Sequence, residues 1–412
     1  MSFRKRSEII GGTRIQPTAV DRNPRQLPLR IPNAAVPGRQ PINIGVRKQE
    51  IAPIAKQDIS NNPGVRPSLV TSQPTTSTGT SDLDKILLHQ GLPLGTSLLI
   101  EESGTTDFAS VIIRAFASQG ILHNRITENL QSHIIVLGLS STWSNDLPGI
   151  YKGSSKEQKK AKIAEQESKV SVSNLASNDL KIAWRYGLNQ KKSEEQNQEN
   201  STYEHYNNQF DLTQKLTPGP NKADISYIQL SNSYQSIISQ IKSIIKQHSN
   251  KVIRLIIPNL LNPSIYPPQL HSANFIIPFI HSLRSLLREY SSLVLISSIS
   301  LDLYSRDNDV VKIFENLFDG VVILQPFDQE MSQLIEKAYR NEPSKIQQGL
   351  VNIVKIPILS EKGLMLVHYG EYAFKNGRKR FEIEEWGIPV EDGDKDTNTT
   401  QEGGQTTKNI DF

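Results

Sequence analysis

From about Leu83 to Arg340, short and almost wholly apolar runs alternate with segments whose apolar residues recur at helical spacing. Strands that are covered on both faces of a parallel sheet have this continuous apolar character, whereas helices that cover a sheet are amphipathic. The runs that fit such strands lie at 97–101, 133–139, 252–257, 293–300 and 320–324. The alternation therefore predicts an α/β fold in which helices flank a mostly parallel sheet.

Local signals give the limits of several further elements. Glycine favours helix C-termini, so Gly120 is predicted to end the helix that starts near Phe108, and Asp328 is predicted to cap a helix that runs to Arg340. Only strand-like runs follow, at 350–357, 363–369, 372–374 and 379–383, which predict an antiparallel C-terminal extension. Residues 140–232 are polar, and their short aromatic islands at 146–151, 180–186 and 206–212 predict a long insertion docked at a few points.

Composition separates this region from its two flanks. Residues 1–80 hold twelve Lys and Arg against four Asp and Glu, together with ten of the 23 prolines and one aromatic residue. Such a segment cannot bury enough apolar area to offset its chain entropy. We therefore expect residues 1–75 to form a disordered basic arm, residues 76–390 to form the domain with order from about Thr78, and residues 391–412 to form a disordered acidic tail.

Several classes of site are excluded by residue types that the chain lacks. It has no cysteine, which excludes disulfides, cysteine-ligated metal centres and a catalytic thiol. Its eight histidines show no metal-binding spacing, so no metal site is predicted. No apolar stretch approaches the roughly 20 residues that span a bilayer. We expect an intracellular protein without a membrane partner.

The segments TGTSDLD (78–84) and GLPLG (91–95), followed by a strand and a turn, resemble the entry to RecA-like ATPase cores. There the turn is G-x-x-x-x-G-K-[ST], whose amides and lysine bind phosphates. Here it reads EESGTTDF (101–108), without lysine and with three acidic residues. At about 4 Å, one pair of like charges costs about 4 kcal/mol at an effective dielectric constant of about 20. Gly104, Thr105 and Thr106 remain candidates to hold a nucleotide shared with a neighbouring subunit, and simple helix capping is the alternative.

The position where an ATPase has its magnesium-binding carboxylate also argues against ATP hydrolysis. The strand 252–257 runs into Pro258-Asn259, where an ATPase would have Asp. We therefore predict no catalytic residue, no hydrolysis by the chain alone and no cofactor, except for ATP at interfaces between subunits of a ring.

A hairpin near the C-terminus is the candidate for RNA binding. Asn376-Gly377 is a strong signal for a two-residue turn, which would pair Lys375 with Arg378, Phe374 with Lys379 and Ala373 with Arg380. Like charges opposite each other cost stability, so this arrangement suggests an anionic partner. Lys375, Arg378, Lys379 and Arg380 are the predicted RNA-binding residues. A solvated basic edge that discourages aggregation remains the alternative.

Longer stretches carry a resemblance to a known family. They are GVRPSLVTSQPTTSTGTSDLD (64–84), GLPLG (91–95), LPGIYKGS (147–154), DLKIAW (179–184), PFDQEM (326–331) and AFKNGRKRFEIEEWGIPV (373–390). Together they closely resemble the PAXNEB family of inactive RecA-like proteins, a family of fungal Elongator subunits. The resemblance implies a RecA-like fold and a six-membered ring with two copies each of the fifth and sixth Elongator subunits. It also implies contact with the remaining Elongator subunits, binding of transfer RNA (tRNA) by the ring, support for modification of the wobble uridine (U34), and a cytoplasmic and nuclear location.

Two other functions stay open at this stage. The chain could be a drifted but active ATPase of the RecA/KaiC type, although the missing lysine and aspartate argue against it. It could also be a nuclear transcription adaptor that acts through its basic arm and acidic tail.

Overall fold

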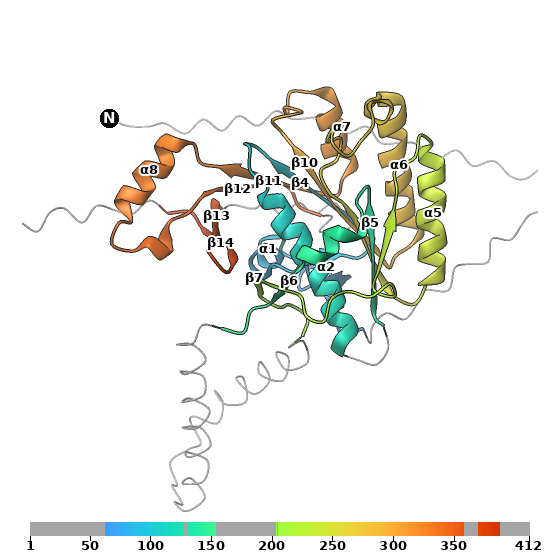
Figure 1. The fold of residues 1–412 in the computed structure, drawn as a ribbon, viewed down its shortest axis with the longest axis horizontal. Coiled ribbons are helices and arrows are strands. Elements are labelled where there is room, and N and C mark those ends of the chain that lie inside the picture. Colours follow the sequence, from blue (N-terminus) through green and yellow to red (C-terminus); the bar gives the residue numbers. More distant parts are fainter. Residues whose placement is uncertain (1–61, 127–129, 154–202, 204, 358–369, 388–412) are drawn as a thin grey trace, which may run out of the picture. The chain divides into compact units, whose positions relative to one another are not determined.

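A nine-stranded sheet in the order β14-β13-β12-β11-β4-β10-β9-β5-β8 forms the centre of the computed structural model, which describes residues 62–126, 130–153, 203, 205–357 and 370–387 (Figure 1). The parallel strands are β4 (Ser97–Glu102), β5 (Ser132–Leu137), β8 (Ile225–Ile228), β9 (Val252–Ile257), β10 (Leu293–Ser300) and β11 (Gly320–Pro326). The antiparallel strands are β12 (Gly349–Lys355), β13 (Tyr372–Asn376) and β14 (Phe381–Glu385). This confirms the predicted α/β fold with an antiparallel C-terminal extension.

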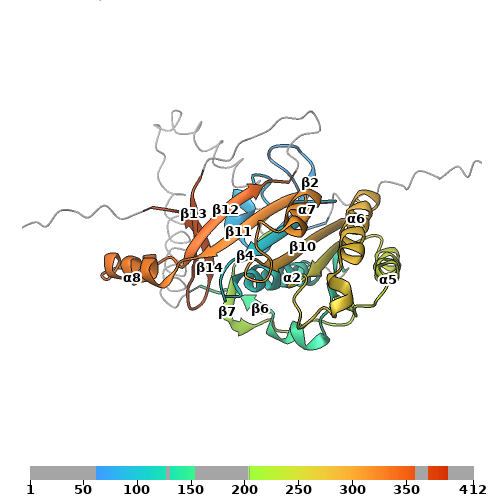
Figure 2. The ribbon, with the colours of Figure 1, turned by 90° about the horizontal axis from the view of Figure 1, so that it is seen from above.

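Helices cover both faces of the parallel strands. Successive residues of a strand point to opposite faces, and here the residues on both faces are apolar. Leu98 and Ile100 pack with α2 (Phe108–Ile126), whereas Leu99 packs on the opposite face. That opposite face is covered by α5 (Tyr234–Gln247), α6 (Ala273–Glu289) and α7 (Asp309–Leu317). The last helix, α8 (Gln329–Ala338), lies beyond the antiparallel strands, at the other end of the sheet from α5 (Figures 1 and 2).

Smaller elements complete the described structure. A three-stranded sheet consists of β1 (Arg66–Pro67), β2 (Pro74–Thr76) and β3 (Leu92–Pro93), and a two-stranded sheet consists of β6 (Pro148–Ile150) and β7 (Phe210–Lys215). Short helices are α1 (Ser81–Ile86), η1 (Ser141–Asp146), η2 (Pro268–His271) and η3 (Pro343–Lys345). No helix in the described ranges combines the length and apolar character that crossing a membrane requires.

Agreement with the predicted elements is closest in the buried strands. The predicted strands at 252–257 and 293–300 have the predicted limits, and Asp328 caps α8 by accepting a hydrogen bond from Met331 N at 2.8 Å. Residues 62–75 of the predicted arm contain β1 and the start of β2. The stretch 140–232, predicted to be an insertion, contains β8 of the central sheet. The predicted arm before residue 62, the strand at 363–369, the island at 180–186 and the acidic tail lie outside the described residues.

The prediction that Gly120 ends a helix is wrong. The helix α2 continues to Ile126, and Gly120 lies in its interior. A Cβ atom at this position would lie 2.7 Å from Cδ of Arg254, which is closer than carbon atoms approach in proteins. The glycine is therefore explained by the close approach of a large side chain from β9, which no local signal in the sequence of α2 shows.

Arg254 is fully buried between β9, α2 and the segment before α1. Its Nη1 donates to the carbonyl oxygens of Ser77 at 2.9 Å and Phe116 at 3.0 Å, and its Nη2 donates to Thr76 Oγ1 at 2.7 Å. The guanidinium also lies over the Phe116 ring, 4.4 Å from the centroid. Burial lowers the pKa of Arg254 to about 10, so the side chain stays charged at neutral pH.

Asp84 is the buried carboxylate of the same polar cluster. It accepts hydrogen bonds from Ser77 Oγ at 2.6 Å, from Thr78 N at 2.7 Å and Thr78 Oγ1 at 2.6 Å, and from Asn207 Nδ2 at 2.6 Å. Burial raises the pKa of Asp84 to about 6, against the effect of these donors and of Arg254. Segments around residues 77, 84, 207 and 254 are therefore joined through charged groups away from water.

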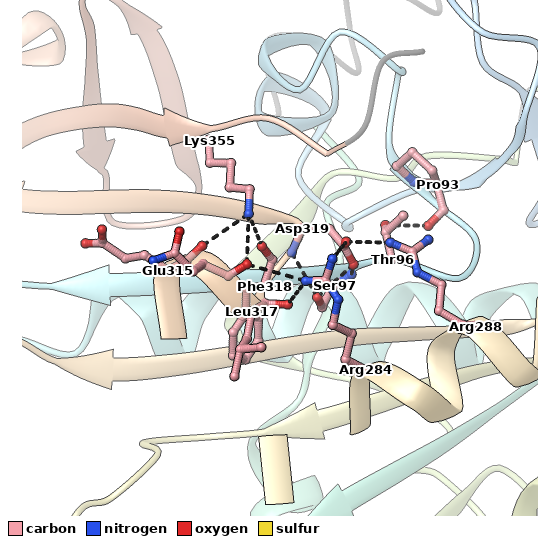
Figure 3. Close-up of polar contacts among 11 residues, drawn as sticks. Pro93, Thr96, Ser97, Arg284, Arg288, Glu315, Leu317, Phe318, Asp319 and Lys355 are labelled. Carbon is pink, nitrogen blue, oxygen red and sulfur yellow. Dashed lines mark hydrogen bonds and ion pairs between the residues drawn. The ribbon is translucent and has the colours of Figure 1, made fainter. Parts of the chain in front are cut away.

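A second polar cluster, shown in Figure 3, lies where β4 and β11 begin. Asp319, just before β11, accepts hydrogen bonds from the amide and hydroxyl of Ser97 and from Arg288, each at 3.0 Å. Arg284 and Lys355 donate to carbonyl oxygens at the C-terminal end of α7. These contacts fix α6 and α7 relative to the first residues of β4 and β11.

Candidate functional site

A side chain of the protein itself fills the anion-binding end of α2, in the turn where a phosphate loop would lie. Glu102, the last residue of β4, is only 5% exposed. Its carboxylate accepts hydrogen bonds from the amides of Phe108 and Ala109, both at 2.8 Å, and from Thr106 Oγ1 at 2.6 Å. Unpaired amides and the helix dipole make this end of a helix favourable for an anion. The carboxylate of Glu102 therefore takes the place of a phosphate group.

The three predicted nucleotide-binding residues lie together in this turn and are exposed, and two of them already have acidic partners. Gly104 has a φ of 91°, and its amide donates to Asp302 Oδ1 at 2.9 Å. Thr106 donates its hydroxyl hydrogen to Glu102. Thr105 is exposed beside them. Because Asp302 follows β10, carboxylates from two neighbouring strands hold the turn in place.

Sequence reasoning identified the acidic character of this turn but missed the hydrogen bonds of Glu102 and Asp302. An acidic residue in the turn that leads into a helix N-terminus is a signal that could have revealed the role of Glu102. Nothing in the sequence around Asp302 shows that it meets Gly104, because the two are brought together only by the pairing of β4 with β10.

Further acidic groups surround the turn. The carboxylate of Glu101 is buried, and Nε of Arg306 lies 3.4 Å from its Oε2 and 2.9 Å from Oε1 of Glu315. Burial and the charge of Glu315 raise the pKa of Glu101 to about 7. Burial and the charge of Glu102 likewise raise the pKa of Asp107. The raised pKa values show that a negative charge is costly at these positions, and a bound triphosphate would add to that cost.

The position expected for a magnesium-binding carboxylate is occupied by an amide. At the end of β9, Asn259 has a φ of 48°, and its backbone amide donates to Ser298 Oγ at 2.9 Å. Magnesium is usually bound through one or two carboxylates together with phosphates and water. Within the described ranges, no group of three or more His, Cys, Asp or Glu residues is placed to hold a metal ion.

The predicted register of the C-terminal hairpin is wrong. The strands β13 and β14 pair Asn376 with Phe381 and Phe374 with Ile383, so residues 377–380 form a longer connection. This connection is closed by a hydrogen bond from Gly377 N to Arg380 O at 2.9 Å. The observed register places the apolar pair Phe374 and Ile383 together in the core on the α2 face, whereas the predicted turn would have placed a lysine opposite Phe374.

The observed register of β13 and β14 changes the interpretation of two of the predicted RNA-binding residues. Lys375 lies opposite Glu382, with Nζ 3.2 Å from Oε2, and Arg380 Nη2 lies 3.0 Å from Oε1 of the same residue. Arg380 also stacks on Tyr151, 4.7 Å from the ring centroid, and donates to Gln209 Oε1 at 3.2 Å. Opposite charges face each other across this hairpin, so the argument from repelling cations fails.

The other two predicted residues, Arg378 and Lys379, are exposed at the tip of the hairpin. The carbonyl oxygen of Lys379 accepts a hydrogen bond from Leu212 N of β7 at 2.7 Å, which joins the tip to the two-stranded sheet. At the end of β7, the exposed Lys215 lies 3.1 Å from Asp146. The hairpin tip thus presents a basic surface, defined here as Arg378 and Lys379.

Comparison with known proteins gives a consistent result over most of the chain. A family model described as PAXNEB protein matches residues 58–412. Elongator complex protein 4 of Saccharomyces cerevisiae is 44% identical over 426 aligned residues, which cover 96% of this chain and 93% of that protein. The protein of the same name from Schizosaccharomyces pombe is 29% identical, covering 85% of this chain and 95% of that protein, and the one from Dictyostelium discoideum is 24% identical, covering 84% and 83%. Because the family model and the yeast relative both extend over nearly all of the described structure, the chain belongs to the PAXNEB family.

Proposed function

We propose that this chain is a non-catalytic subunit of the Elongator complex that forms a ring with the fifth and sixth subunits, binds tRNA and supports modification of the wobble uridine (U34). The names of its relatives support the assignment to Elongator. A mostly parallel sheet with helices on both faces is compatible with the RecA-like core that such a ring requires. The observation that carries the non-catalytic role is the carboxylate of Glu102 on the first amides of α2.

A nucleotide could use this turn only by displacing Glu102. The triphosphate would then lie beside the carboxylates of Glu102 and Asp302, without the lysine that neutralises phosphates in a phosphate loop. This disfavours a drifted ATPase. Nucleotide turnover should be measured with the full chain alone and then with the fifth and sixth subunits added. We expect none with the chain alone, and turnover there would favour the ATPase. ATP at ring interfaces would show as turnover that needs all three subunits.

The replacement of Glu102 by Gln tests the role of the carboxylate directly. The amide keeps an acceptor oxygen but loses the charge that complements the helix end, so we expect the free energy of unfolding to fall by about 1–2 kcal/mol. Addition of ATP should not restore it. Urea unfolding with and without ATP measures both effects, and Glu336→Gln on the exposed side of α8 is the matched control. An ATP-dependent rise in wild-type stability would contradict the proposal.

The loop after β10 is a second place where RNA could contact the protein. The distribution of charge favours the basic surface over this loop. That loop, residues 301–308, contains Asp302 and Asp307, and its cation Arg306 already pairs with Glu101 and Glu315. Phosphate contacts need cations that are not neutralised by the protein. Arg378 and Lys379 at the hairpin tip meet this requirement better than Lys375 and Arg380, which share Glu382.

Charge reversal at the hairpin tip tests this contact. For the double variant Arg378→Glu with Lys379→Glu we expect the affinity of the assembled ring for tRNA to fall about tenfold, with a shallower dependence of binding on salt. The affinity is measured by fluorescence anisotropy at several salt concentrations. Lys337→Glu with Arg340→Glu changes the same charge near α8 and should have a smaller effect. Equal losses in both double variants would show a long-range charge effect instead of a contact.

The transcription adaptor makes the opposite prediction. It requires residues 1–61 and the acidic tail, whereas the hairpin tip would be dispensable. We expect U34 modification in cells to survive deletion of residues 1–61 and to decrease in the double hairpin variant. The proposed cytoplasmic and nuclear location is tested in the same cells by fluorescence microscopy of the tagged full chain.

A further inference from the structure

Helix α8 carries a stripe of exposed apolar side chains, defined here as Met331, Leu334 and Ala338. The three recur at i, i+3 and i+7, the spacing that places residues on one side of a helix. Met331 is 42% exposed and Leu334 is 62% exposed, and Ala338 is exposed beside them. Only Ile335, among the ten residues of α8, is buried. The part of the chain that the structure describes therefore leaves this stripe largely uncovered.

The last described residues of the chain lie against this helix. The ring centroids of Phe327, just before α8, and Trp386 are 5.2 Å apart. The hydroxyl of Tyr339, just after α8, donates to Gly387 O at 3.3 Å. Gly387 is the last residue that the structure describes, so the described chain ends beside α8.

The residues that follow Gly387 match the stripe in character and in reach. They read IPVED (388–392), with the aliphatic Ile388 and Val390 followed by two carboxylates. Three residues of extended chain span about 10 Å. Leu334 lies about 6 Å along the helix from the C-terminal end of α8. Both aliphatic side chains can therefore reach the stripe.

Charge near the C-terminal end of α8 complements the IPVED segment. Lys337 and Arg340 are exposed there, and neither forms an ion pair within the described residues. Lys345, the next cation along the chain, already pairs with Glu342. The two carboxylates of the segment would thus meet cations that the protein has not neutralised. Exposed ion pairs add little stability, so they would orient the segment while the aliphatic side chains hold it.

We propose that α8 is the docking site of the chain's own segment 388–392, whose Ile388 and Val390 pack on the stripe. The carboxylates that follow lie beside Lys337 and Arg340. Because the segment continues directly from residues that already contact α8, docking is intramolecular, and a tether this short gives an effective concentration on the order of millimolar. Two aliphatic side chains can therefore suffice here, although they would hold a separate protein only weakly. The inference does not depend on the proposed function.

Disulfide formation tests the docking directly, because the chain has no cysteine of its own. Leu334→Cys is combined with Val390→Cys in the full chain, and the rate of intramolecular disulfide formation with diamide is followed by mass spectrometry of tryptic peptides. The matched control combines Glu336→Cys with Val390→Cys, because Glu336 is exposed about 200° around the same helix from Leu334. A disulfide forms readily only where the two Cα atoms approach within about 7 Å. We expect the Leu334 pair to react at least tenfold faster than the control pair.

A further substitution tests whether the aliphatic contact drives the docking. Ile388→Ser, added to the Leu334 and Val390 pair, should slow the disulfide to within about threefold of the control rate, because it removes one of the two side chains that hold the segment. Ile410→Ser removes the same side chain near the end of the tail and should leave the rate unchanged. Circular dichroism verifies that every variant is folded.

Equal rates for the Leu334 and Glu336 pairs would refute the docking, because an undocked segment meets both sides of the helix alike. Disulfides that join two chains, seen as dimers on non-reducing gels, would instead make a second copy the occupant of the stripe. Equal rates, together with slower maleimide labelling of Leu334→Cys after the other Elongator subunits are added, would make a partner subunit the occupant. None of these results bears on tRNA binding or nucleotide turnover, so the proposed function is tested separately.

Discussion

Replacement of Arg254 by Met is expected to lower the free energy of unfolding by about 3–5 kcal/mol, the cost of leaving buried charged and polar groups without their partner. The variant would remove the donor to Ser77 O, Phe116 O and Thr76 Oγ1. It would also remove the cation that favours the charged form of the buried Asp84. Methionine fills much of the same volume, so the decrease in the free energy of unfolding comes chiefly from the lost polar contacts.

Urea unfolding of the full chain, followed by circular dichroism, measures this loss. Arg378→Met is the matched control, because the same side chain is exchanged at an exposed site and should change stability by less than about 0.5 kcal/mol. If Arg254→Met were as stable as the control, the buried cluster would not support the fold. A second change, Asp84→Asn in the Arg254→Met background, should recover part of the loss, because it removes the buried negative charge that Arg254 would no longer offset.

Replacement of Glu101 by Gln is expected to change the pH dependence of stability. The pKa of Glu101 is raised in the folded protein from 4.5 to about 7. Below pH 4.5 the carboxyl is protonated in both folded and unfolded states, and its contribution to stability is fully present. As the pH rises through 7, the folded state must accept a buried charge, and the contribution is lost. This difference in pKa corresponds to about 3 kcal/mol.

The variant should therefore gain stability relative to the wild type as the pH rises, with most of the gain between pH 5 and 7. The quantity to measure is the difference in free energy of unfolding between Glu101→Gln and wild type at pH 4.5, 6 and 8. His123 and His133, whose pKa values burial lowers, titrate with the opposite sign, but they are present in both proteins and cancel. Glu336→Gln should give a difference that does not change with pH. A constant difference for Glu101→Gln would show that Glu101 titrates normally.

The sequence predicts those parts of the fold whose residues are constrained by local burial alone. Every residue of β9 and all but the last residue of β10 are buried, and their largely apolar runs give the limits of both strands. The short strand β8 was missed because four residues in a polar stretch carry too weak a pattern, and its place is set by pairing with β5. Where the local pattern is too weak to predict a strand, as in β8, pairing with a distant segment determines whether the strand forms.

Contacts between segments far apart in the sequence account for the other errors. Gly120 has the sequence signature of a helix end, yet it serves the approach of Arg254 from β9. The Asn376-Gly377 signal is strong, yet packing of Phe374 with Ile383 selects a different register. In both cases a tertiary contact outweighs a local preference of about 1 kcal/mol.

At the candidate site, the sequence shows which ATP-binding residues are absent, but it does not show which side chains contact the turn in their place. The absence of a lysine in the turn and of an aspartate after β9 can be read directly from the residues. The new partners of the turn cannot, because Asp302 reaches Gly104 only through the arrangement of the sheet. The hydrogen bonds of Glu102 span six and seven residues and were within reach of a closer analysis of helix capping.

The placement of Glu102 also makes the order of this turn independent of a ligand. In a phosphate loop, the anion at the helix N-terminus belongs to the nucleotide and leaves with it. Here the anion is attached to the strand itself and can neither diffuse away nor be hydrolysed. The first turn of α2 therefore has its anion from the moment the chain has folded, whether or not a nucleotide is present.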